Sequence, residues 1–143
     1  MMENFKIEPL KGYGDLQFGM PIDDVVEILG QPTNQEEIDS AYEDDNHVIV
    51  LDYDDNDFSA YFEGDTEQRL SNFYTFNEHS ELYGAKIFDL NKEQLVELMK
   101  ENGFETFIED KEDGDCITYE ELNLDFYFDN NQLVEVFWEC QRG

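Results

Sequence analysis

The sequence predicts an α+β fold: two tandem helix-plus-four-strand repeats that form one extended antiparallel sheet, with the helices packed on one face. Three observations predict this class. An amphipathic helical segment occurs twice, about seventy residues apart. Each occurrence is followed by short segments of alternating or β-branched residues, which favour strands. Turns rich in glycine, asparagine or aspartate separate those segments.

The first repeat is expected over residues 1–78, beginning with a leader. Pro21 suits the first turn of a helix, where its missing N–H costs nothing, and Gly30 and Pro32 end that helix. An antiparallel meander of four strands then follows. These strands are expected over residues 36–44, 47–53, 58–63 and 69–76.

The second repeat, residues 79–143, follows the same order of elements. Asn91 is a suitable N-cap for a helix over residues 92–101, and Gly103 ends it. Strands are expected over residues 104–110, 116–121, 124–128 and 133–140. We expect the two repeats to form one structural unit, since a second copy extends the sheet and enlarges the core.

Residue matches between the two halves support the duplication. Tyr13 and Gly14 match Tyr83 and Gly84, and the alignment continues without a gap through both helices. Further matches follow in the strands after small deletions, which fall in predicted loops.

The helix-entry segment FGMPIDDVVEILGQP, residues 18–32, resembles a motif of two related groups. These are the small outer-membrane-assembly lipoproteins and the beta-lactamase-inhibitory-protein superfamily. The resemblance to the inhibitory proteins implies tandem repeats whose joined sheet forms a concave, protein-binding surface. The chain is also similar in build to acidic bacterial toxin-immunity proteins, a similarity used only as an analogy.

The composition indicates a folded but strongly anionic domain. The 143 residues carry 37 acids against 8 bases, a formal charge of −29, and 15% are aromatic. Such a charge repels nucleic acid and anionic membranes and attracts basic proteins. Alternatively, the acidity only provides solubility or suits a salt-rich habitat. The absence of a signal peptide at the start, of a membrane span and of a disulfide framework predicts a cytoplasmic protein.

The sequence contains no pattern typical of an active site. The two histidines, His47 and His79, stand in no nucleophile or metal motif, and acidic pairs are too common for one to stand out. We therefore expect no enzymatic activity and no cofactor.

A calcium-loop pattern occurs at residues 52–63. Asp52, Asp54, Asn56 and Glu63 occupy loop positions one, three, five and twelve, but Asp57 replaces the glycine needed at position six. Strands flank the segment instead of helices. An acidic hairpin is the favoured interpretation, and a calcium-responsive protein remains the third functional hypothesis.

Side-chain alternation along the strands predicts one buried and one outer sheet face. The inward set is almost wholly apolar: Phe58, Ala60, Phe62, Phe73, Leu124, Phe126, Phe128, Val134, Val136 and Trp138. The outer face mixes rings with carboxylates. Its expected partner-binding residues are Tyr61, Tyr74, Tyr127, Phe137, Glu63, Asp125, Asp129 and Glu135.

These features favour a non-enzymatic protein-binding module. The leading hypothesis is an inhibitor or immunity-type protein, a monomer or weak dimer, that neutralises a basic toxin or enzyme by occlusion. Alternatively, the outer rings are ordinary cross-strand packing pairs. The second functional hypothesis is an assembly domain that acts through sheet-edge pairing or homo-oligomerisation.

Overall fold

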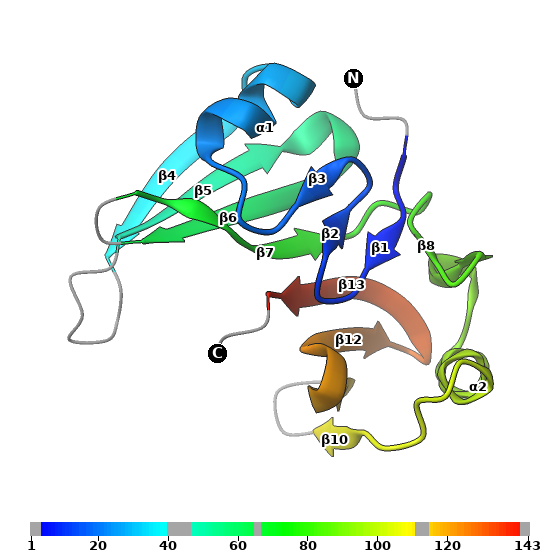
Figure 1. Ribbon diagram of the computed structural model, residues 1–143. Coiled ribbons are helices and arrows are strands. Elements are labelled where there is room, and N and C mark those ends of the chain that lie inside the picture. Colours follow the sequence, from blue (N-terminus) through cyan, green and yellow to red (C-terminus); the bar gives the residue numbers. More distant parts are fainter. Residues whose placement is uncertain (1–3, 40–46, 65–66, 111–114, 141–143) are drawn as a thin grey trace.

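The structure is a computed structural model that describes residues 4–39, 47–64, 67–110 and 115–140. An eight-stranded antiparallel sheet dominates it, in the order β10-β11-β12-β13-β7-β6-β5-β4 (Figure 1). Four of these strands come from residues 34–75: β4 (Asn34–Asp39), β5 (His47–Tyr53), β6 (Phe58–Gly64) and β7 (Arg69–Thr75). The other four are β10 (Ile108–Asp110), β11 (Asp115–Tyr119), β12 (Leu124–Asp129) and β13 (Gln132–Glu139).

Two small sheets accompany the large one. The first consists of β1 (Ile7–Glu8), β2 (Gly12–Tyr13) and β3 (Leu16–Gln17), and the second of β8 (Glu81–Leu82) and β9 (Ala85–Lys86). Three single turns of 3-10 helix, η1 (Asp54–Asn56), η2 (Ile87–Asp89) and η3 (Glu120–Leu122), also occur.

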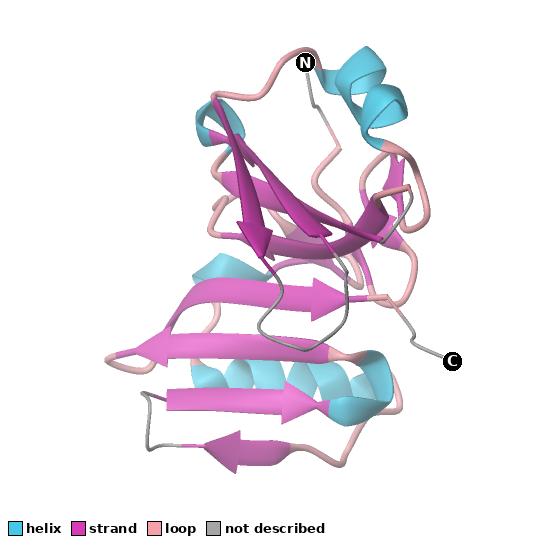
Figure 2. Cartoon of the chain, turned by 90° about the vertical axis from the view of Figure 1, so that its left-hand side faces the viewer, coloured by secondary structure: helices cyan, strands magenta, loops and turns pink. Residues whose placement is uncertain are grey.

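The two α-helices are short. Helix α1 covers Ile22–Leu29, and helix α2 covers Lys92–Glu101. The predicted N-cap of α2 is confirmed: the Asn91 side chain accepts from the Gln94 N–H, and the Gln94 side chain accepts from the Asn91 N–H. Figure 2 shows α2 behind strands β10 to β13. The helix covers this rear face of the sheet, while the face toward the viewer carries no α-helix.

The predicted α+β class of two helix-plus-four-strand repeats is wrong. The protein is mostly β, with 49% strand against 22% helix, and the described residues contain two α-helices beside the large sheet. The physical reason lies in the segments before the helices. Residues 7–17 and 81–86 contain turns at Leu10, Gly14 and Gly84 that fold them into additional strands, which alternation over longer runs did not reveal.

The hydrophobic core lies between the helix-bearing face of the large sheet, the small sheet β1–β3 and the two helices. Trp138 is fully buried, and its ring packs against Tyr13 and Phe73 with centroids 5.1 and 5.2 Å apart. The Trp138 indole Nε1 donates to the Gly12 carbonyl at 3.0 Å. This hydrogen bond joins the centre of the large sheet to the small sheet, as does the contact of the Tyr13 hydroxyl with Thr75 on β7.

The predicted inward set is buried with one exception, Val134. Its side chain is 38% exposed, and Leu133 is buried instead. The strand register shifts between Tyr127 and Phe128, where Tyr127 pairs with Glu135 but Phe128 pairs with Leu133. Val134 is thus the extra residue of a β-bulge, which the alternation did not anticipate.

Candidate functional site

The eight predicted partner-binding residues lie on the four central strands of the large sheet. Tyr61 and Glu63 are on β6, and Tyr74 is on β7. The others are Asp125, Tyr127 and Asp129 on β12, with Glu135 and Phe137 on β13. Since β12, β13, β7 and β6 are adjacent in the sheet, these positions form one surface. We call this surface, defined by the eight residues, the aromatic–acidic face.

Cross-strand pairing brings six of the eight residues together. Phe137 lies opposite both Tyr74 and Asp125 on its two neighbouring strands, and Tyr127 lies opposite Glu135. The rings of Tyr61 and Phe137 meet edge-to-face with centroids 6.3 Å apart. All six side chains are partly exposed, so rings and carboxylates alternate on a surface that solvent reaches.

Nearby carboxylates contribute, after burial, to the raised pKa values of two tyrosine hydroxyls on this face. The pKa of Tyr74 is raised, first by burial and then because its hydroxyl donates a hydrogen bond to Glu135, whose charge also opposes ionisation. Burial also raises the pKa of Tyr127 to about 12, with Asp125, Cys116 and Glu135 adding to the effect. Negative charge therefore converges on the hydroxyls from several strands.

Asp125 on this face has a raised proton affinity. Burial raises its pKa, and a hydrogen bond from Thr118 partly opposes that change. A charged carboxylate that is half removed from water gains stability when a cation approaches it. The position of Asp125 between Thr118 and Phe137 thus favours an incoming ammonium or guanidinium group.

Glu63 and Asp129 lie farther out. Each comes two residues beyond Tyr61 or Tyr127, past the register shift of its hairpin. Glu63 pairs across strands with Val48 and Arg69, and Asp129 pairs with Gln132 at the exposed end of β12. The structure therefore places these two carboxylates at the rim of the face.

Several residues of the same surface were missed from the sequence. Phe76 follows β7, is 49% exposed and meets Tyr74 edge-to-face at 6.3 Å. Asp52 and Glu36 act on Tyr61, whose pKa is raised by burial and then by these two charges. The alternation of β7 could have indicated Phe76, because it lies two residues after Tyr74. Asp52 could be assigned to this surface only from the pairing of β5 with β6, which alternation alone does not predict.

The calcium-loop pattern is not assembled in the structure. Asp52 lies opposite Ser59 and accepts its hydroxyl at 2.5 Å, while Glu63 lies opposite Val48 at the other end of the hairpin. Asp54 and Asn56 are in η1, and Asp57 takes a left-handed conformation with φ of 54°. Within the described residues no group of three or more His, Cys, Asp or Glu side chains is arranged to hold a metal.

The other candidate residues lie apart from this face. His79 is exposed in the link after β7, and the side chain of His47 falls outside the described residues. Cys116 lies on β11, and Cys140 follows β13. Burial raises the pKa of Cys116, which disfavours the reactive thiolate.

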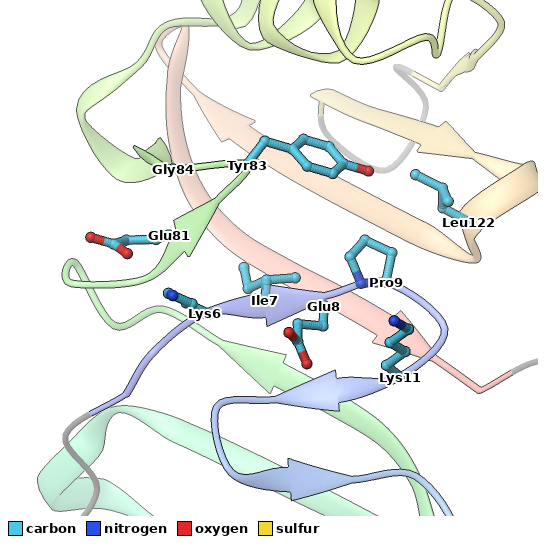
Figure 3. Close-up of a pocket in the computed structure, with 9 residues that line it drawn as sticks. All are labelled: Lys6, Ile7, Glu8, Pro9, Lys11, Glu81, Tyr83, Gly84 and Leu122. Atoms are coloured by element: carbon cyan, nitrogen blue, oxygen red, sulfur yellow. The ribbon is translucent and has the colours of Figure 1, made fainter.

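A separate pocket of about 410 Å³ lies near β1 and the β8–β9 turn (Figure 3). It is lined by residues 6–9, 11, 81, 83–84 and 122. These come from three segments that are distant in the sequence, so we call it the seam pocket. An isolated bridge between Lys6 and Glu81, with the Glu81 N–H donating to the Phe5 carbonyl at 2.9 Å, holds two of the segments together.

Comparison with models of protein families, with curated proteins and with solved structures found no match. The resemblance to the inhibitory proteins and lipoproteins thus stays a prediction. In the part of the chain that the structure describes, no helix has both the length and the apolar character needed to cross a membrane.

Proposed function

We propose that the protein is a non-enzymatic binding module that captures a basic protein on its aromatic–acidic face and blocks that partner by occlusion. The observation that carries this proposal is the alternation of half-exposed rings and carboxylates across four adjacent central strands. A toxin or enzyme with a cationic surface fits this chemistry, and such an inhibitor or immunity-type protein would act in the cytoplasm.

Capture would occur in two stages. The formal charge of −29 steers a cationic partner toward the molecule over a distance set by the salt concentration. Tyr61, Tyr74, Tyr127 and Phe137 then supply contact area at low entropic cost, since their strands already fix them. Asp125 and Glu135 pair with lysine or arginine side chains that come to lie between the rings.

The edge strands favour binding through the face over binding through the sheet edge. Strand β4 is an outer strand of the large sheet, and it carries Glu36 and Glu37 in an exposed position. Charges on an edge strand oppose pairing with another chain. The assembly hypothesis is therefore the less favoured of the two.

The test is affinity capture from the native cell with the wild-type chain and with Tyr127→Ala. We expect the wild type to retain a basic protein, and the substitution to weaken that complex about 30-fold, the effect of losing a central aromatic anchor. The affinity of the purified pair should fall roughly tenfold between about 0.05 M and about 0.5 M salt.

Matched charge variants separate a local effect from a general one. Glu135→Gln removes a carboxylate from the aromatic–acidic face. Glu101→Gln removes a carboxylate from an exposed position of helix α2 and makes the same change in net charge. Only the first should weaken the complex substantially. Equal effects of the two variants, or a complex indifferent to Tyr127→Ala, would refute the proposed face. A stable dimer that ignores both changes would favour the assembly hypothesis.

A further inference from the structure

One residue that lines the seam pocket has a strained backbone conformation. Among the described residues, those with positive φ that are not glycine are Leu10, Asp57, Tyr83, Asn123, Asn130 and Asn131. Asparagine and aspartate adopt this conformation readily, but bulky side chains do not. The two bulky cases are Leu10 with φ of 64° and Tyr83 with φ of 52°. Tyr83 lines the seam pocket, whereas Leu10, between the lining residues Pro9 and Lys11 in the sequence, lines a different hollow. Such strain persists only where the surrounding structure holds it, and it occurs often at ligand-binding sites.

The strained conformation of Tyr83 presents its ring to the pocket. Tyr83 and Gly84 form the turn between β8 and β9, a position where asparagine and glycine are favoured. The ring stacks on Phe104 with centroids 6.2 Å apart and stays 40% exposed. Figure 3 shows it extending over Pro9 toward Leu122, with its hydroxyl at the far end. The Tyr83 ring thus lies opposite the apolar side chains of Pro9 and Leu122 in the pocket.

The charges at the pocket are balanced, unlike those of the whole chain. Lys6 and Lys11 line it together with Glu8 and Glu81, so the formal charge of the lining is zero in a molecule of −29. Elsewhere Lys92 binds two carboxylates, Glu109 and Asp115. Within the described residues, neither Lys6 nor Lys11 has an acidic group within ion-pair distance. Both ammonium groups therefore remain available to a ligand.

We propose that the seam pocket binds a small zwitterion with an apolar side chain, such as a free aromatic amino acid. Its carboxylate would pair with Lys6 or Lys11, its ammonium with Glu8 or Glu81, and its side chain would pack between Tyr83, Pro9 and Leu122. A net anion would enter against the field of the whole protein, whereas a zwitterion does not. The volume of about 410 Å³ lies in the range of small-molecule sites, which often lie between segments as this one does.

Three probes of one shape test the charge requirement. L-phenylalanine carries both charges, 3-phenylpropionate carries only the carboxylate, and phenethylamine carries only the ammonium. Each is titrated into the full ¹⁵N-labelled chain while amide chemical shifts are recorded. We expect saturable shifts of residues 6–11, 81–84 and 122 with phenylalanine, and at least tenfold weaker binding of the other two. Absence of saturation by phenylalanine at about 20 mM, or equal binding of 3-phenylpropionate, would overturn the proposal.

Two substitutions assign the binding to the pocket. Tyr83→Asn removes the ring but keeps a residue that accepts a left-handed conformation, so the fold should persist by circular dichroism while phenylalanine binding is lost. At least one of the changes Lys6→Met and Lys11→Met should weaken phenylalanine binding at least fivefold, and the matched change Lys100→Met at an exposed position of helix α2 should not. Unchanged binding in Tyr83→Asn would refute the site. Because this readout uses no basic protein, it fails or succeeds independently of the proposed capture function.

Discussion

The two faces of the large sheet are both rich in aromatic rings, but they use them differently. On the helix-bearing face, Phe73 and Trp138 are fully buried and stack on one another. On the other face, their immediate neighbours Tyr74 and Phe137 are partly exposed and lie among carboxylates. Adjacent residues of one strand thus serve stability and recognition separately, because side chains alternate across a sheet.

This division indicates how the faces should respond to substitution. Rings on the buried face fix the fold through dispersion and excluded water, so their removal leaves a cavity. Rings on the aromatic–acidic face are only partly buried, so their removal should cost the isolated protein less. Equal losses of stability on removing rings from the two faces would contradict this division.

The largest expected effect is on Trp138. Trp138→Ala should lower the free energy of unfolding by about 4 kcal/mol, since it removes the contacts with Tyr13 and Phe73 and leaves the Gly12 carbonyl without its donor. Phe137→Ala, one residue away, should cost less than about 1 kcal/mol. Urea unfolding followed by circular dichroism measures both. If Trp138→Ala does not fold, Trp138→Phe provides the measurement, and equal costs at the two positions would contradict the division.

A smaller effect separates two buried tyrosines of the core. The Tyr13 hydroxyl contacts Ser80 at 2.6 Å and Thr75 at 3.1 Å, whereas the buried Tyr119 hydroxyl has no hydrogen-bond partner among the residues that the structure describes. Tyr13→Phe should therefore destabilise the protein by about 1–2 kcal/mol, and Tyr119→Phe should stabilise it by up to about 1 kcal/mol. Thermal melts of both variants show whether each substitution lowers or raises the stability. Destabilisation by Tyr119→Phe would show that its hydroxyl has a partner.

The smallest expected effect is a pH-dependent one at Asp125. Its raised pKa means that the folded state binds the proton more tightly than the unfolded state. Asp125 therefore contributes stability below its unfolded pKa of about 4, and this contribution is lost as the pH rises through the folded pKa.

Asp125→Asn should consequently stabilise the protein at neutral pH by up to about 0.5 kcal/mol, with less gain in acid. Denaturation curves at several pH values measure this gain. The same substitution should weaken capture of a basic partner, as expected where function opposes stability. A gain that stays constant from neutral to acidic pH would exclude the titration of Asp125 as its cause.

The sequence predicted the longer elements of the fold well. Helix α2 has the predicted bounds and N-cap, and strand β5 matches its prediction at 47–53. Periodic patterns over seven or more residues carry enough information to define an element and its inner face. Strands of two residues, such as β2 and β8, carry no such period, and their omission contributed to the wrong fold class.

The candidate sites were predictable to different degrees. The aromatic–acidic face could be outlined from alternation, but Val134 departs from it because a bulge changes the phase without a sequence signal. The seam pocket could not be predicted at all. Its lining depends on β1, the β8–β9 turn and Leu122 coming together, and on the left-handed backbone of Tyr83, where the residue type favours a different conformation.

The place of β13 has a consequence for how the chain is made. Residues 132–139 form the last strand along the described chain, yet they lie in the middle of the large sheet, between β12 and β7. During synthesis, the two flanking strands emerge before the segment that joins them. The cooperative core, including the contact between Trp138 and Gly12, cannot close until this segment has left the ribosome, so folding depends on contacts between residues far apart in the sequence and should proceed slowly.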